Sequence, residues 1–565
     1  MNLPFAPRRA SVFFAACAFA LAASGAQAQS GAFPPAGDQL VAQRYILTAE
    51  EAFAQGRGDC ALAVLLRAND FADASSDVSY LLALARIDQG HSRLLSLAAI
   101  ESALATNKWM RYGEAQALEL QAGLLVDLRR FSVALGALDA RAAIASENAE
   151  TTLLRLRALK GLAFDGPSIP RSYAADFRAL ATQAVNMSPR DPRPLRLLFE
   201  YALQVAGSPG PQDIALIELG LRRLPFLLDL DPDLAWLAAP FIGDLEEARR
   251  LLLAYRAGSI GPLPGFLPNP ASIPLALNLG LLDDFHAVDE LFAWGEAAEI
   301  DREIVNAVAG LLRGNAGRDA LALGLHSFTG AIVGDENRDG IIESRAVFRN
   351  GFLQALYLDL DQDGVADWIV SFDTGLPSRG EFIALPDASS PPTTALRGEI
   401  VWDRYPFVQR VALGEETYFF APGSFAYGPI LFENIGAAET YQGLLVPARD
   451  PMSAGLTRHA LAMAASFVER PSAEFPDGIE RAYLRQGVPV LSEVRAQGVL
   501  VSVTEFEAGF PVVQRVDVLR EGRLQTLRRF HPGSLALMSV SVDWNGDGEF
   551  ELVEMYLEDG SIVHK

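Results

Sequence analysis

The chain has 565 residues, too many for one ordinary domain, and 50% of them are apolar. This apolar content supplies material for large cores and excludes intrinsic disorder as the main state. With 47 Lys and Arg against 70 Asp and Glu, the formal net charge is -23. A charge of that sign repels phosphate backbones and anionic membrane surfaces, so it argues against nucleic acid as a partner.

Residues 1–28 have the pattern of a secretory signal peptide. Arg8 and Arg9 precede a short apolar run over 11–23, and small residues stand at the usual cleavage spacing over 26–28. The run is too short to span a bilayer, and no later segment reaches about 18 uninterrupted apolar residues, so we expect no transmembrane segment in the mature chain. The sequence therefore predicts an exported protein, periplasmic or associated with the cell envelope.

The two cysteines bear on whether the chain is lipid-anchored and whether it contains a disulfide. A lipid anchor through Cys17 is disfavoured, because residues 14–17 are a poor lipobox and cleavage there would leave an apolar mature end. Cys60 alone then remains, which excludes an intramolecular disulfide. Its position at the start of an apolar-periodic segment predicts a buried small side chain rather than a reactive thiol.

Residues 37–325 show helical spacing of apolar residues, with short polar breaks. Three breaks share a plan, in which a polar turn is followed by a large apolar residue and, three positions on, by a small or branched one: 128–134, 243–248 and 282–288. This plan predicts helical hairpins, the large residue closing the turn and the small one allowing close helix packing. The stretches 165–170 and 206–211 are expected loops, and 258–274 is expected to be a non-helical binding loop or connector.

The helical region resembles the tetratricopeptide-repeat class. Its consensus-like spacing is carried by Leu118, Ala122, Leu125, Ala134 and Leu138, and residues 184–192 resemble the helix-then-Pro ending of such repeats. The repeats are degenerate; for example, Gln121 and Arg141 stand at expected small or aromatic positions. The resemblance implies an α-solenoid whose concave face binds a protein or peptide partner.

Residues 326–565 change to strand character. Alternation replaces helical spacing, and an aromatic residue or Leu is repeatedly followed three positions later by Gly. Each such Gly is expected to need a positive φ in a tight turn between strands. The glycines are Gly351, Gly375, Gly423, Gly487, Gly509, Gly522 and Gly533. The region is predicted to be an antiparallel β-meander with one inserted helix over 454–470 and a loop over 387–394, giving an α+β chain with its two classes in separate domains.

Three acidic loops in this region repeat one pattern, with oxygen-bearing side chains at positions 1, 3, 5 and 9 and Gly at position 6. Carboxylates and amides at alternate positions converge on one point when Gly permits the sharp turn, which suits calcium. The first two copies stand 24 residues apart. The expected metal ligands are Asp335, Asn337, Asp339 and Glu343; Asp359, Asp361, Asp363 and Asp367; and Asp543, Asn545, Asp547 and Glu551.

These loops resemble those of EF-hands, dockerins and thrombospondin type 3 repeats. They depart from the EF-hand at position 12, where Ala346 and Val370 stand and only Glu554 fits. With strand-like sequence around them, they are interpreted as calcium-braced β-hairpins. The alternative is a set of solvated Asx turns with no ion; the crowding of carboxylates favours a cation.

The sequence lacks the common catalytic signatures. The six histidines show no pairing, and there is no HExxH, GxSxG, Walker loop or GxGxxG opening a helix. The hypothesis is a non-enzymatic interaction or scaffold protein of the bacterial envelope. The alternatives are an envelope carbohydrate-binding protein or hydrolase, with Trp368, Trp402 and Trp544 as stacking candidates or packing residues, and a purely structural spacer.

Overall fold

The computed structural model describes residues 37–164, 172–205, 207, 209–258, 268–297, 299–335, 342–359, 362–384, 396–436, 444–447, 456–557 and 561–564. The predicted signal peptide, the expected loops over 165–170 and 387–394, and residues 259–267 of the Pro-rich stretch lie outside these ranges. Among the described residues, no helix is long and apolar enough to cross a membrane.

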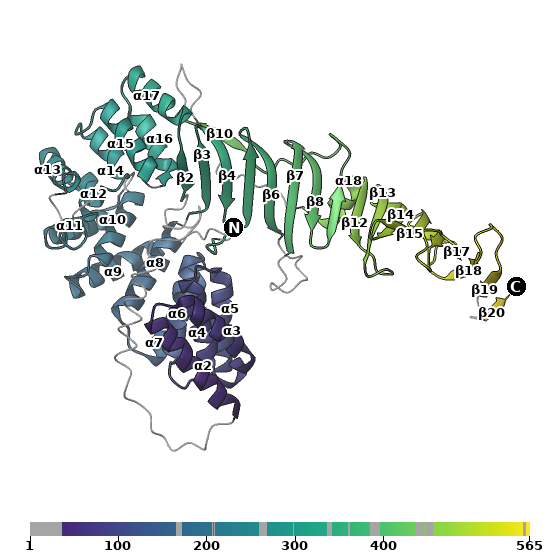
Figure 1. Ribbon diagram of the computed structural model, residues 1–565. Coiled ribbons are helices and arrows are strands. Elements are labelled where there is room, and N and C mark those ends of the chain that lie inside the picture. Colours follow the sequence, from purple (N-terminus) through teal and green to yellow (C-terminus); the bar gives the residue numbers. More distant parts are fainter. Residues whose placement is uncertain are drawn as a thin grey trace.

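Helices fill the first half of the chain and form a curved array (Figure 1). They are α2 (Gly37–Ala54), α3 (Gly58–Ala68), η1 (Asn69–Ala74), α4 (Ser76–Asp88), α5 (Arg93–Thr106), α6 (Glu114–Asp127), α7 (Phe131–Ile144), α8 (Ala149–Phe164), α9 (Ser172–Met187), α10 (Arg193–Val205), α11 (Pro211–Arg223), η2 (Leu224–Phe226), α12 (Leu234–Ala238), η3 (Ala239–Phe241), α13 (Leu245–Arg256), α14 (Ser272–Asn278), α15 (Asp284–Ala297), α16 (Arg302–Leu311) and α17 (Asn315–His326).

Strands fill the second half, apart from α18 (Arg458–Ala464). They are β1 (Ile300–Asp301), β2 (Gly330–Gly334), β3 (Ser344–Arg349), β4 (Phe352–Leu358), β5 (Trp368–Asp373), β6 (Leu376–Ala384), β7 (Leu396–Arg404), β8 (Phe407–Leu413), β9 (Glu416–Phe419), β10 (Phe432–Ile435), β11 (Leu444–Pro447), β12 (Phe467–Pro471), β13 (Gly478–Arg485), β14 (Val488–Ala496), β15 (Val499–Glu507), β16 (Phe510–Val516), β17 (Thr526–Phe530), β18 (Leu537–Val542), β19 (Leu552–Tyr556) and β20 (Ile562–His564). The α+β fold class is confirmed.

The helices pack as successive hairpins with a series of cores. One cluster of buried side chains runs from α2 to α8, a second from α8 to α12, and a small third one joins α12, α13 and α14. The five residues that carry the tetratricopeptide resemblance are all buried, which confirms them as core positions: Leu118, Ala122, Leu125, Ala134 and Leu138. Stacking of this kind makes each hairpin depend on its neighbours for its core.

The shared plan of the helix breaks is confirmed only in part. The small or branched residues Ala134, Ala248 and Val288 are buried, as expected. Of the large residues, Phe131 is buried and packs against Gly161 of α8, whereas Leu245 and Phe285 are exposed, so the expectation that they close the turn is wrong. They lie on the outer side of the first turn of α13 and α15, and the buried position follows three residues later in each helix.

Two further expectations need correction. The stretch 258–274 was expected to contain no helix, but α14 begins at Ser272 with Pro274 in its first turn, where a missing N–H costs no hydrogen bond. The helix expected over 454–470 is confined to Arg458–Ala464, and Phe467 begins β12. Pairing of β12 between β9 and β13, with the Phe467 ring stacked on Phe419, overrides the helical pattern there.

The strands β2 to β9 and β12 to β20 form one antiparallel meander, in which each strand pairs with the next, and β12 follows β9 directly. All seven glycines expected to have a positive φ do so, which confirms the turn prediction. At Asn350–Gly351 and Thr374–Gly375 both turn residues have a positive φ, the backbone of a tight hairpin turn. β1 pairs parallel with β2 and ties the helical region to the sheet.

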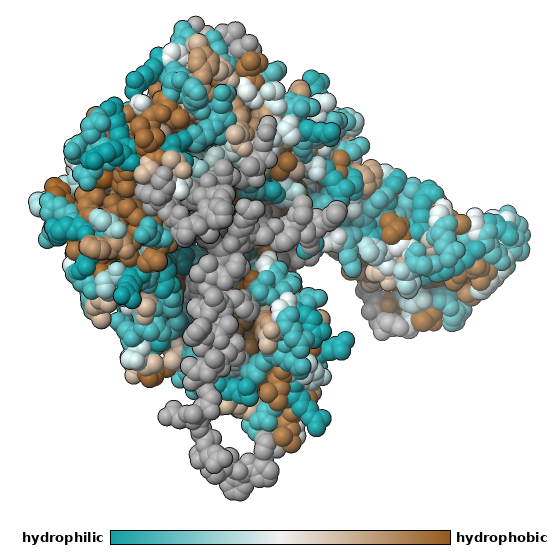
Figure 2. Space-filling model, turned by 60° about the vertical axis from the view of Figure 1, so that its left-hand side comes forward, coloured by the Kyte–Doolittle hydropathy of each residue, from teal (hydrophilic) through white to brown (hydrophobic). Residues whose placement is uncertain are grey.

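The two regions share one core. Buried residues of α14 to α17, such as Leu291 and Leu325, belong to the same cluster as Leu356, Trp402 and Val411 of the sheet. Beyond β12 the sheet continues as an arm, defined here as β13 to β20; α18 packs against β13, and no helix is seen along the strands from β14 onward (Figure 1). This arm is mainly hydrophilic, with isolated hydrophobic side chains (Figure 2).

Candidate functional site

The third acidic loop, between β18 and β19, brings three of its predicted ligands together. Asp543, Asp547 and Glu551 each offer a carboxylate oxygen, and these atoms lie within 4.8 Å of one another. In the described part of the chain, no other group of three or more His, Cys, Asp or Glu residues has this geometry. Three carboxylates at this separation repel one another unless a proton or a cation balances them.

The backbone of this loop is held by Asx-type hydrogen bonds. Asp543 accepts N–H groups of Gly546 at 2.6 Å and of Gly548 at 3.0 Å. The side-chain oxygen of Asn545 accepts the N–H of Asp547 at 2.8 Å, so Asn545 is engaged within the loop itself. Gly548 at position 6 has a φ of 95°, which only Gly adopts without strain. The turn thus brings the carboxylates close to one another at the surface.

The second loop, between β4 and β5, is more buried. Asp359 is 1% exposed and accepts the N–H groups of Asp363 at 3.0 Å and Gly364 at 2.8 Å. Asp363 is also buried, and its carboxylate accepts the N–H of Val365. Asp367 directly precedes β5, and its N–H donates to the carbonyl of Leu358 in β4 at 2.7 Å. Asp361 lies outside the described residues.

Only the two ends of the first loop are described, namely Asp335 and Glu343; Asn337 and Asp339 lie outside the described residues. Glu343 accepts a hydrogen bond from the Gln362 amide at 2.6 Å, and its carbonyl accepts the N–H of Asp359 at 2.9 Å. The last residue of the first loop therefore contacts the second loop directly. The two repeats are linked where their predicted ligands lie.

Sequence reasoning missed a fourth loop of the same form, over 517–525 between β16 and β17. Asp517 is fully buried and accepts the N–H groups of Glu521 at 3.0 Å and Gly522 at 2.6 Å, the same two bonds that Asp359 makes in its loop; Asp543 shares only the bond from the Gly at position 6. Position 3 is Leu519, and position 9 is Gln525. Asp followed by Gly five residues later was the available signal. This loop form can therefore be built without acids at positions 3 and 9.

The three tryptophans considered as stacking candidates do not form one surface. Trp368 is buried and stacks on Phe382 with ring centroids 4.7 Å apart. Trp402 is buried and donates its ring N–H to the Tyr427 carbonyl at 2.8 Å. Trp544 is 58% exposed and lies in the third acidic loop. Trp368 and Trp402 are thus packing residues.

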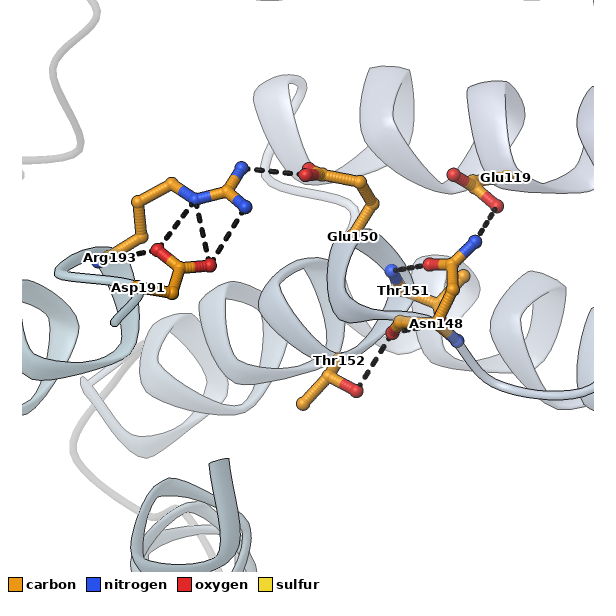
Figure 3. Close-up of polar contacts among 7 residues, drawn as sticks. All are labelled: Glu119, Asn148, Glu150, Thr151, Thr152, Asp191 and Arg193. Atoms are coloured by element: carbon orange, nitrogen blue, oxygen red, sulfur yellow. Dashed lines mark hydrogen bonds and ion pairs between the residues drawn. The ribbon is translucent and has the colours of Figure 1, made fainter. Parts of the chain in front are cut away.

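The helical array is braced by polar contacts between successive hairpins. Arg193 at the start of α10 pairs with Asp191 at 2.8 Å and with Glu150 of α8 at 2.6 Å (Figure 3). The hydrogen bonds that Arg193 donates to Asp191 and Glu150 raise its pKa above the ordinary value. In the preceding unit, Asn148 donates to Glu119 at 3.2 Å and accepts the N–H of Thr151. These contacts link neighbouring hairpins at their surface.

A buried carboxylate organises the loop between α5 and α6. Asp77 of α4 is fully buried and accepts the N–H groups of Met110 at 3.0 Å, Arg111 at 2.9 Å and Tyr112 at 3.3 Å. Burial raises the pKa of Asp77, while these hydrogen bonds lower it. Cys60, by contrast, is only partly buried, and its side chain packs against the first core.

Comparison with known proteins gives no family. No family model matches the chain. A protein of Treponema pallidum (strain Nichols), described only as an uncharacterized protein, is 23% identical over 655 residues, covering 97% of this chain and 80% of that protein.

Among solved structures, MamA from Desulfovibrio magneticus RS-1 is 14% identical with a TM-score of 0.27, covering 34% of this chain and 96% of its own. PilF of Pseudomonas aeruginosa is 18% identical with a TM-score of 0.23, covering 46% of this chain and 92% of its own.

Proposed function

We propose that this protein is an exported, non-enzymatic interaction protein of the bacterial envelope, which binds a protein or peptide through the concave face of its helical array and calcium through its acidic loops. The stack of helical hairpins supports the first part, because such arrays offer long continuous surfaces to extended partners. The meeting of three carboxylates in the third loop carries the second part.

Calcium would act as a brace for the arm. A site with a dissociation constant of about 10⁻⁴ M, in about 1 mM free calcium, adds roughly 1.4 kcal/mol to the free energy of unfolding. In the described part of the arm, Val494, Ala496, Val501 and Val516 form one small core cluster together with Phe475, which precedes β13. An increment of this size is a large fraction of the stability that such a core supplies.

The test compares two substitutions at position 5, one in the third loop and one in the fourth. Asp547→Asn removes a carboxylate of the converging triad, whereas Glu521→Gln removes one from the loop that has Leu519 at position 3. Calcium should raise the melting temperature of the wild type and of Glu521→Gln, relative to excess chelator. It should raise that of Asp547→Asn by less, and magnesium should not substitute. Equal calcium shifts in both variants would contradict a site in the third loop.

Partner binding is tested with the mature full-length chain as bait in envelope extracts of the source cell, with recovered proteins identified by mass spectrometry. A bait lacking the helical array would lose part of its shared core, so the control is a surface variant. Substituting charged residues along the concave face should abolish capture. If capture survives the substitutions on the concave face but is lost when residues of the arm are substituted, the binding surface lies in the sheet.

A further inference from the structure

The fourth loop, over 517–525, differs from the third in what surrounds its first carboxylate. Asp517 is fully buried, whereas Asp543, at the same position of the third loop, is only partly buried. A buried carboxylate needs hydrogen-bond donors or a cation, because burial removes the water that would otherwise solvate its charge. Two donors to Asp517 are backbone N–H groups of the turn.

A third donor to Asp517 comes from the side chain of Gln525 at position 9. Gln525 is buried, and its amide lies among hydrogen-bond acceptors. With the amide nitrogen turned towards these acceptors, it donates to Asp517 Oδ1 at 3.2 Å and to the Arg523 carbonyl at 2.7 Å. The buried carboxylate therefore receives three hydrogen bonds from N–H groups of its own loop.

The second acid of the fourth loop also has a partner within the loop. The carboxylate of Glu521, at position 5, lies 3.7 Å from the guanidinium of Arg523, at position 7. Both side chains are exposed, so the pair is weak, but it sets a positive charge beside the acid. The third loop has Glu549 at position 7 instead.

The third loop has a carboxylate where the fourth has an amide. Its position 9 is Glu551, whose carboxylate lies within 4.8 Å of those of Asp543 and Asp547. Glu551 also accepts the backbone N–H of Trp544 at 2.7 Å, which holds it beside the other two acids. The interaction between positions 1 and 9 is therefore attractive in the fourth loop and repulsive in the third.

We propose that Gln525 closes the fourth loop without a metal ion, and that the residue at position 9 decides whether a loop of this form takes a divalent cation such as calcium. An amide at position 9 donates to the carboxylate at position 1. A carboxylate at position 9 adds an oxygen ligand and leaves two charges for a cation to balance. The role of Gln525 stands on its own contacts, while the extension to the third loop rests on the calcium site proposed there.

Two substitutions that barely change side-chain shape test this proposal in the full-length chain. Gln525→Glu places a second carboxylate beside the buried Asp517, and Glu551→Gln gives the third loop the amide of the fourth. Hydrogen exchange at the amides of Glu521 and Gly522 reports on the fourth loop. Calorimetric titration with calcium, and with magnesium for comparison, counts the bound ions.

In excess chelator, exchange at these two amides should rise roughly tenfold or more in Gln525→Glu, because a buried carboxylate loses a donor and gains a like charge. Calcium should return exchange to the wild-type rate, and this variant should bind one calcium ion more than the wild type. Wild-type exchange in chelator would overturn the role of Gln525. Raised exchange that calcium leaves unchanged would overturn the selection by position 9.

Glu551→Gln tests the same rule in the opposite direction. In chelator it should slow exchange at the amides of Gly546 and Gly548, which donate to Asp543, because the repulsion between positions 1 and 9 is removed. Unchanged or faster exchange would contradict the rule even if Gln525→Glu failed to fold.

The calcium site of the third loop can fail separately. If the wild type and Glu551→Gln bind equal numbers of calcium ions, that site is absent, yet an additional ion in Gln525→Glu would still support the selection by position 9. Equal numbers of bound ions in all three proteins would overturn that selection.

Discussion

Replacing Asp77 by Ala should open the loop between α5 and α6 while leaving the rest of the array folded. The carboxylate accepts three backbone N–H groups, those of Met110, Arg111 and Tyr112, at 2.9 to 3.3 Å. A buried donor left without a partner costs about 1 to 3 kcal/mol. Water can enter the space left by the carboxylate and satisfy some donors, so the lower limit of about 1 kcal/mol for each of the three is the appropriate figure. The expected loss is then about 3 kcal/mol.

Hydrogen exchange followed by mass spectrometry measures this loss locally, without requiring two-state unfolding of so long a chain. A loss of about 3 kcal/mol corresponds to an increase of roughly a hundredfold in exchange at amides 110–112. Asp77→Asn, which keeps one acceptor oxygen, should give a smaller increase. The control is Glu101→Ala on the exposed face of α5, which should leave exchange unchanged. Unchanged exchange in Asp77→Ala would refute the reasoning that this carboxylate holds the loop.

Two further predictions concern other parts of the chain. Trp402→Ala should lower the free energy of unfolding by about 3 to 5 kcal/mol, because it empties a buried site and leaves the Tyr427 carbonyl without its donor. The control is Trp544→Ala, at an exposed site, and calorimetry compares the unfolding of the two variants with that of the wild type. The hydrogen bond and charge of Asp283 raise the pKa of His286, so the pair stabilises the start of α15 at low pH, and this contribution is lost as the pH rises through the folded-state pKa of His286. Asp283→Asn should lower that pKa in an NMR titration, and an unchanged value would contradict the pairing.

The turn residues of the sheet could be predicted because their cause is local. A positive φ is a property of one residue and its peptide neighbours, so a Gly at a turn position, such as Gly351 or Gly487, predicts it from the sequence. The small residues of the helical breaks were predictable for a related reason, since the close approach of two helices excludes large side chains at positions such as Ala134 and Ala248.

What the sequence could not specify are contacts between distant segments. Phe467 lies in a strand because Phe419 and Tyr483 flank it in the sheet, although the local pattern favours helix. The contact of Ser92 with Asp363 joins residues whose spacing carries no signal. The fourth loop was missed for a different reason. Metal-ligand types were used to recognise the loops, whereas the bonds that this loop shares with the second loop need Asp at position 1 and two backbone N–H groups.

The fourth loop also bears on the ligands of the other three. If acids at positions 3 and 9 were needed for folding of the turn, a loop with Leu519 and Gln525 would not adopt it, yet Asp517 makes the same two bonds as Asp359. Among the three converging acids of the third loop, only Glu551 at position 9 has no acidic counterpart in the fourth loop, so its charge adds repulsion that this form of turn does not require. A bound cation would offset that repulsion, and this is the reason for proposing calcium rather than solvated turns at Asp543, Asp547 and Glu551.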